Sequence, residues 1–96
     1  MRILESEVFT KELNIILSYI ASKESLKAKE KFKKQLRQAL SKLDFMPYKY
    51  RKSLAFDDEN IRDFIFKGYV IPYKIEKDFI VILAIYKENL PNFTSI

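Results

Sequence analysis

The last third of the chain constrains the fold most, because three apolar runs follow one another there with only short breaks. The runs are IRDFIF at 61–66, YVIPYKI at 69–75 and FIVILAIY at 79–86. The first break contains Lys67 and Gly68, the only glycine of the chain. At the second position of a two-residue turn, glycine supplies the positive φ that a tight hairpin needs. The pattern predicts a three-stranded antiparallel meander.

Two details refine this prediction. Both alternate sets of residues in FIVILAIY are apolar, which is typical of a strand that is central or covered on both faces. The second run contains Pro72, and proline cannot donate a hydrogen bond to a neighbouring strand. We therefore keep this run as a strand and expect a local irregularity at Pro72.

The first half of the chain predicts one strand and a helical hairpin. Residues 2–9 mix apolar and polar side chains without helical spacing, which favours a short strand. Thr10 is the expected N-cap of a first helix and Ser25 that of a second. Pro47 then ends the helical region. The apolar rows at helical spacing are Leu13, Ile16, Leu17 and Ile20 in the first helix, and Leu26, Phe32, Leu36, Ala39, Leu40 and Leu43 in the second.

The remaining segments complete the order of elements. KYRKSLAF at 49–56 is predicted as a further short strand, DDEN at 57–60 as an acidic turn, and NLPNFTSI at 89–96 as a short tail that lies over the sheet or frays. The result is an α+β fold in one domain, 1–96. It has an N-terminal strand, a helical hairpin and an antiparallel sheet of three to four strands, with the helices packed on one face.

The residue types that are missing exclude several functions. The chain has neither cysteine nor histidine, which excludes thiol nucleophiles, disulfides, Cys/His zinc sites and catalytic triads that use a histidine base. We expect no metal and no cofactor. No run reaches the roughly 18 apolar residues of a membrane-spanning helix, and the start lacks the apolar region of a signal peptide. These observations predict a soluble, cytoplasmic protein with no membrane partner.

The positive charge is concentrated in one segment. Between Ser22 and Leu43 there are eight Lys/Arg and two Glu, a local charge of +6, whereas the whole chain carries +5. Four cations on or beside the outer face of the second helix are candidates for binding an acidic protein segment: Lys27, Lys31, Lys34 and Arg37. Steering toward ribosomal RNA and an ordinary solvated helix face are the alternatives.

The order of elements together with IRDFIFKGYVIPYKIEKDFIVILAIYKENLP resembles the RelE/ParE superfamily of bacterial type II toxin–antitoxin toxins. The resemblance covers nearly the whole chain. It also rests on LNIILSYIAS, on AKEKFKKQLRQALSKLDFMPYKYR and on the Ile61-Arg62 pair. It implies a compact toxin that a cognate antitoxin neutralises in a hetero-oligomeric complex.

The resemblance leaves two mechanisms open. RelE-like and YoeB-like members cut mRNA on the ribosome with Arg and Lys side chains around the scissile phosphate, whereas ParE-like members poison DNA gyrase without a nuclease site. Without histidine, a YoeB-like arrangement is excluded. A degenerate toxin that only binds its antitoxin is the third alternative.

The resemblance and the local patterns together give the candidate nuclease residues. Lys49, Arg51 and Lys52 alternate with Tyr48 and Tyr50, which is typical of RNA contact because cations bind phosphate and tyrosines stack on bases. The alternative is a solvated turn whose tyrosines anchor it to the core.

The remaining candidates lie in the predicted sheet. Arg62 is either a phosphate clamp, an antitoxin contact or a strand-surface arginine paired with Asp57, Asp58 or Asp63. Arg62, Lys52, Lys87 and Tyr86 form the candidate catalytic set, in which Lys87 would stabilise charge and Tyr86 would donate a proton. Glu88 and Val70 occupy positions where nuclease members of the superfamily tend to carry cations. Both differences weaken the hypothesis that this chain cleaves RNA. Core packing is the alternative role for Tyr86.

Overall fold

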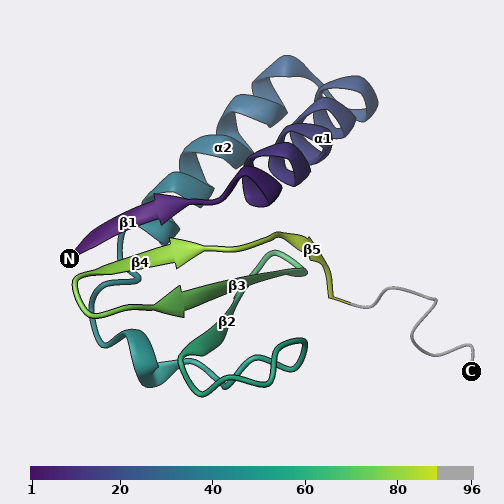
Figure 1. Ribbon diagram of the computed structural model, residues 1–96. Coiled ribbons are helices and arrows are strands. Elements are labelled where there is room, and N and C mark those ends of the chain that lie inside the picture. The colour runs from purple at the N-terminus through teal and green to yellow at the C-terminus, as the bar shows by residue number, and fades with distance from the viewer. Residues whose placement is uncertain (89–96) are drawn as a thin grey trace, which may run out of the picture.

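The computed structural model describes residues 1–88, so the prediction for the tail at 89–96 lies outside the described residues. Figure 1 shows the two helices side by side, followed by the strands of one sheet. The elements are β1 (Arg2–Glu5), α1 (Glu7–Lys23), α2 (Leu26–Leu40), the 3₁₀ helix η1 (Pro47–Lys49), β2 (Ile61–Phe66), β3 (Tyr69–Ile75), β4 (Phe79–Ile82) and β5 (Tyr86–Lys87). The predicted α+β class and order of elements are confirmed.

The sheet is mixed. Its strands lie in the order β1, β4, β3, β2, with β5 also pairing with β3 (Figure 1). The predicted antiparallel meander is confirmed by the β2–β3 and β3–β4 ladders. The first strand runs parallel to β4, with Arg2 opposite Phe79 and Glu5 opposite Ile82. A parallel partner is available because the helical hairpin carries the chain back across the sheet before the meander begins.

The first helix begins earlier than predicted. Ser6, and not Thr10, is the N-cap of α1: its backbone is extended and its Oγ accepts a hydrogen bond from Phe9 N at 3.0 Å. Thr10 lies inside the helix and donates its hydroxyl to Ser6 O. The predicted strand 2–9 is correspondingly shortened to Arg2–Glu5. The second N-cap prediction is confirmed, since Ser25 Oγ accepts from Ala28 N at 2.9 Å.

The turn between β2 and β3 matches the sequence prediction. Lys67 has φ 49° and Gly68 has φ 84°, and positive φ at both central residues is the geometry of a type I′ hairpin turn. Its right-handed twist suits the flanking strands and fixes Phe66 opposite Tyr69.

The expected irregularity at Pro72 is present, but the extra residue lies in the segment between β4 and β5 that pairs with β3. Tyr73 pairs with Ile82 and Val70 with Tyr86, so two residues of β3 face three residues of the other chain segment. This is a one-residue bulge, and it splits the predicted run 79–86 into β4 and β5. Pro72 O accepts a hydrogen bond from Leu83 N at 2.9 Å. Proline has no N–H to donate in return, so the ladder is interrupted there.

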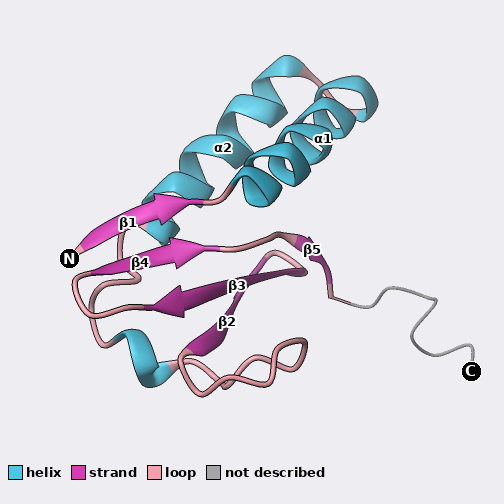
Figure 2. Ribbon diagram, in the orientation of Figure 1, coloured by secondary structure: helices cyan, strands magenta, loops and turns pink. Residues whose placement is uncertain are grey.

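The strand predicted at 49–56 is wrong. Among residues 1–88 this segment forms one bridge, between Lys52 and Arg62, supported by hydrogen bonds from Ser53 N to Ile61 O and from Asp63 N to Arg51 O. The segment then leaves the sheet as a long loop beside β2, drawn in pink in Figure 2. This loop runs beside the edge of β2, and its Leu54 and Ala55 lie near Val70 and Tyr86 on the sheet face that points away from the helices.

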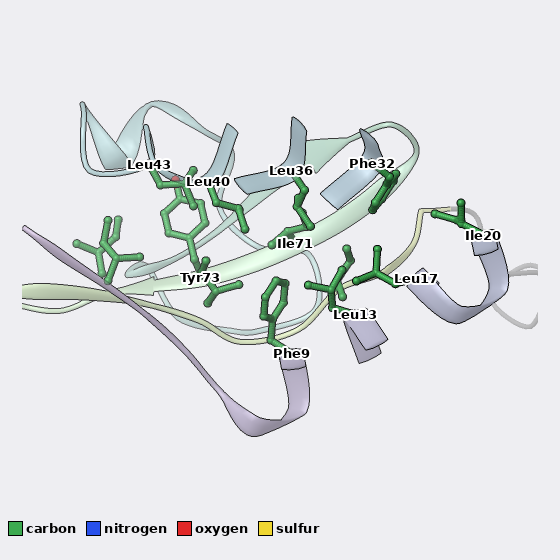
Figure 3. Close-up of a cluster of buried hydrophobic side chains, with 14 residues drawn as sticks. Phe9, Leu13, Leu17, Ile20, Phe32, Leu36, Leu40, Leu43, Ile71 and Tyr73 are labelled. Atoms are coloured by element: carbon green, nitrogen blue, oxygen red, sulfur yellow. The ribbon is translucent and has the colours of Figure 1, made fainter. Parts of the chain in front are cut away.

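The hydrophobic core lies between the helix pair and one face of the sheet. Ile71 and Tyr73 of β3 are completely buried, and side chains from both helices converge on them (Figure 3). The same face of β2 and β3 carries Arg62 opposite Tyr73, whereas Asp63 and Pro72 point to the other face. Within residues 1–88, neither helix is long and apolar enough to cross a membrane.

Candidate functional site

Arg62 lies on the helix-facing side of β2, where it holds the loop 48–59 in place. Its Nε donates to Glu59 O at 3.1 Å, and its Nη1 donates to Tyr50 O at 3.2 Å and Tyr48 O at 3.4 Å. Its Nη2 is 3.4 Å from Glu59 Oε1. The side chain is only 17% exposed. Its acidic partner is therefore Glu59, and the pairing predicted with Asp57, Asp58 or Asp63 is not formed.

The two tyrosines of the loop anchor it to the protein. The Tyr48 ring lies against the Arg62 guanidinium, 4.9 Å from its central carbon, and its hydroxyl donates to Asn60 Oδ1 at 2.6 Å. Tyr50 meets Phe64 edge to face, with 5.2 Å between ring centroids. Lys49 lies over the Tyr50 ring at 5.1 Å and is exposed. The tyrosine rings are thus partly occupied by contacts within the chain.

Arg51 lies on the opposite face of the sheet, paired with a buried carboxylate. The Asp63 side chain is 0% exposed, and its Oδ2 accepts from Arg51 Nε and Leu54 N, each at 3.2 Å. Asp63 Oδ1 is buried without a hydrogen-bond partner among the described residues. An isolated carboxylate is costly to bury, and the positive charge of Arg51 offsets part of that cost for Asp63.

Lys52 is placed near Arg62 by the shared partner Glu59. Its Nζ is 3.5 Å from Glu59 Oε2 and 3.7 Å from Asp57 Oδ1. These exposed carboxylates offset its charge and also part of the charge on Arg62. The acidic turn predicted at 57–60 therefore pairs with two of the candidate nuclease cations, Lys52 and Arg62.

Tyr86 and Lys87 lie at the other end of β3. Tyr86 is opposite Val70 and points away from the helices, whereas Lys87 is opposite Tyr69 and lies over its ring at 4.6 Å. Burial, and secondarily the charge of Asp63, raises the pKa of the Tyr86 hydroxyl. A raised pKa disfavours tyrosinate, so Tyr86 is suited to keep or donate a proton and not to act as a base.

The predicted catalytic residues do not converge on one point. Arg62 and Lys52 meet at Glu59, Tyr86 faces the opposite side of the sheet, and Lys87 faces α1. Arg62 and Lys87 oppose β3 residues four positions apart, which is roughly 13 Å along a strand at about 3.3 Å per residue. In this structure the four side chains therefore do not surround one point.

The basic face of α2 is open to solvent. Lys27, Lys31 and Lys34 are exposed, and no ion pair in the described part of the chain involves them. Arg37 instead pairs with Glu5 of β1. Three of the four cations predicted to bind an antitoxin are therefore available for an acidic partner.

Sequence reasoning missed two polar roles. The sequence suggested Asp63 only as one of three possible partners of Arg62, and Glu12 was not among the candidate residues. Glu12 Oε1 in fact accepts a hydrogen bond from Ile85 N at 2.9 Å. Asp63 shares the outer face of β2 with Ile61, which is buried, and Ile65, which is 38% exposed, and nothing in the sequence identifies Arg51 as its partner.

Comparison with known proteins decides the family. The family model described as the ParE toxin of type II toxin–antitoxin system, parDE, matches residues 4–89. The chain belongs to the ParE toxin family. The matched region contains every described helix and strand except the first residues of β1. The RelE/ParE resemblance inferred from the sequence is thereby confirmed.

A solved structure supports the same fold. The chain is similar to a chain of the chromosomal ParDE TA system from P. aeruginosa, with a TM-score of 0.77 and 12% sequence identity. The match covers 93% of this chain and 97% of that chain. No curated protein matches the chain significantly.

Proposed function

We propose that this ParE-family chain is a growth-inhibiting toxin that binds DNA gyrase without cleaving RNA and that a cognate antitoxin neutralises. The observation that supports the proposal is the ion pairing of three of the candidate nuclease cations. Arg51 is paired with Asp63, Lys52 with Asp57 and Glu59, and Arg62 with Glu59. A toxin that acts by binding a protein needs no free phosphate site.

The chemistry of RNA cleavage explains why this pairing matters. Attack by a 2′-hydroxyl requires a group that takes its proton, cations that stabilise the phosphorane and a donor for the leaving oxygen, all around one phosphorus atom. The Nε and both terminal nitrogens of Arg62 already donate to Tyr48, Tyr50 and Glu59. Using Arg62 as a clamp would therefore release the loop that it holds.

Neutralisation by an antitoxin is supported by the exposed charge of α2. Lys27, Lys31 and Lys34 occupy one stretch of its surface and lack acidic partners within residues 1–88. An acidic, partly disordered antitoxin segment that folds on binding suits such a surface, because opposite charges steer the encounter and fix its register.

Ribosome-dependent mRNA cleavage is the second candidate function. The observation that favours it is the exposure of Tyr48, Lys49 and Lys87, which leaves cations and one aromatic ring accessible to RNA. In this reading Lys52 and Lys87 would supply charge and Tyr86 the proton, with rearrangement on the ribosome bringing them together.

Parallel assays of the purified chain distinguish the candidates. DNA supercoiling by gyrase is measured with increasing toxin, and ribosomes translating a defined mRNA are treated with the same preparation and mapped by primer extension. Lys52→Ala and Lys87→Ala are compared with Lys77→Ala, which alters an exposed cation in the β3–β4 turn.

Inhibition of supercoiling with intact transcripts, unchanged in all three variants, is the expected result. New transcript ends that disappear with Lys52→Ala or Lys87→Ala but persist with Lys77→Ala would overturn the proposal in favour of an mRNA interferase. If neither assay responds and induced cells keep growing, the chain is an antitoxin-binding module and the proposal also fails.

A further inference from the structure

The side of α2 that faces away from the core carries a row of lysines. Lys27, Lys31 and Lys34 are exposed, whereas Phe32 and Leu36 of the same helix are buried. At about 100° per residue, the mean direction of the three lysines lies roughly 150° from that of the two buried residues. We call Lys27, Lys31 and Lys34 the lysine face of α2. Their ammonium groups therefore extend into solvent, where a large ligand can reach them.

The charges of the lysine face are not offset by acids in the described part of the chain. Its three lysines form no ion pair within residues 1–88, and Glu30, the only acid of α2, pairs with Lys29. The segment from Ser22 to Leu43 carries a local charge of +6. A concentration of one sign of charge on one face attracts polyanions and raises their rate of encounter.

The composition of the lysine face favours phosphate groups as ligands. The strongest contacts between proteins use Trp, Tyr and Arg, and lysine is depleted at the centre of such interfaces. On α2 the only large apolar side chain that is exposed is Leu26, at its first residue, and Arg37 is paired with Glu5. Lysine ammonium groups act as mobile point charges, which suits a phosphate backbone because no fixed paired geometry is needed.

The same composition favours a duplex over a single strand. Proteins that bind single strands stack the bases on aromatic side chains, and the only aromatic residue of α2, Phe32, is buried. The lysine face extends over seven residues, about 10.5 Å at about 1.5 Å per residue. One strand of B-DNA has a phosphate about every 3.4 Å along its axis, so the face spans about three phosphates. We propose that the lysine face of α2 binds the phosphate backbone of duplex DNA without regard to its sequence.

This proposal goes beyond gyrase inhibition, because it concerns a ligand that the chain binds by itself. The lysines would also steer an acidic antitoxin segment, so DNA and antitoxin should compete for the toxin. Gyrase acts on duplex DNA, and toxin bound to DNA would be concentrated near that enzyme. DNA binding is measured without gyrase, so its failure and the failure of the proposed function are separate results.

Fluorescence anisotropy of a labelled duplex of about 20 base pairs tests the proposal with the purified full chain, at about 50 and about 200 mM NaCl. The test variant carries Lys27→Gln, Lys31→Gln and Lys34→Gln. Glutamine has nearly the helix propensity of lysine, so α2 is retained. The control removes the same charge at three exposed cations of other elements, which form no ion pair within residues 1–88: Arg2→Gln, Lys11→Gln and Lys77→Gln.

The dependence of affinity on salt gives the number of phosphate contacts. Each contact contributes about 0.9 to the slope of log K against log salt concentration, so the test variant should have a slope shallower by about 2.7. Raising the salt from about 50 to about 200 mM should then weaken binding about 40-fold more for the unchanged chain than for the test variant. We expect the control to keep nearly the slope of the unchanged chain.

Several results would overturn the proposal. Equal slopes for the test variant and the control would mean that the lysine face is not the binding surface. Absence of binding by the unchanged chain at about 50 mM salt would show that the face is only solvated. Tighter binding of a duplex RNA of the same sequence would make RNA the ligand. Tighter binding of a poly-glutamate peptide of equal charge would make an acidic protein segment the ligand.

Lysine acetylation followed by mass spectrometry provides an independent check on the unchanged chain. Duplex DNA at about 50 mM salt should slow acetylation of the lysine face at least about fivefold, because bound phosphates cover its ammonium groups. Lys11 and Lys77 are exposed on other elements and should react as before. Uniform protection of all lysines, or none, would contradict the proposal even if the test variant fails to fold.

Discussion

Removing Arg51 should destabilise the protein far more than removing an equally exposed arginine elsewhere. Arg51→Ala leaves the Asp63 carboxylate buried without its counterion, while one of its oxygens already lacks a partner among the described residues. Breaking a fully buried pair costs about 3–5 kcal/mol. The Arg51 side chain is 42% exposed, so water can replace part of the interaction, and we expect a loss of about 2 kcal/mol.

The chain offers a closely matched control. Arg37 is 43% exposed and also pairs with a carboxylate, but that carboxylate, Glu5, is 32% exposed, whereas Asp63 is 0% exposed. Arg37→Ala should therefore cost at most about 1 kcal/mol. The free energy of unfolding is measured by urea denaturation followed by circular dichroism. For a domain of this size, a loss of about 2 kcal/mol corresponds to roughly 8–16 °C in Tm.

A double variant tests the cause directly. Asp63→Asn removes the buried charge and keeps an acceptor for Leu54 N–H. If the uncompensated charge is the source of the loss, Arg51→Ala with Asp63→Asn should be more stable than Arg51→Ala alone by about 1 kcal/mol. The reasoning is refuted if the double variant is the less stable of the two, or if Arg51→Ala costs no more than Arg37→Ala.

Three further predictions concern the helices and the core. Reversing the charge of Lys27, Lys31 and Lys34 together should weaken antitoxin binding and reduce its salt dependence. The prediction is contradicted if the variant and the unchanged chain bind antitoxin with the same affinity at each of two salt concentrations. Ser6→Ala should lower the free energy of unfolding by about 1–2 kcal/mol because it removes the cap of α1, whereas Thr10→Ala should have a much smaller effect in the same denaturation assay. Burial raises the pKa of the Tyr73 hydroxyl above its ordinary value of 10.0, so the folded chain keeps a proton that the unfolded chain loses. Stability should then fall as pH rises above about 10, and this fall should be smaller in Tyr73→Phe when unfolding is measured from about pH 8 to about pH 11.

The sequence by itself determined the parts of the fold that depend on local chemistry. Alternating apolar residues predicted the meander, Ser25 predicted the start of α2, and Gly68 predicted a turn that needs positive φ. Pro72 indicated an irregularity because the missing N–H is a property of the residue. The same local pattern carried the family resemblance, since the order and spacing of the elements are written along the chain.

Only the tertiary structure decided which charges meet. The sequence shows Arg51, Lys52 and Arg62 as neighbours of several acids, but it does not show that Asp63 is buried or that Lys52 and Arg62 share Glu59. Nor does it show that opposite strand faces separate Arg62 from Tyr86. Those outcomes depend on strand register and on the course of the loop 48–59, where a one-residue shift would exchange the faces. Pairing across distant segments is a property of the packed chain, and it places Arg51, Lys52 and Arg62 beside acidic side chains.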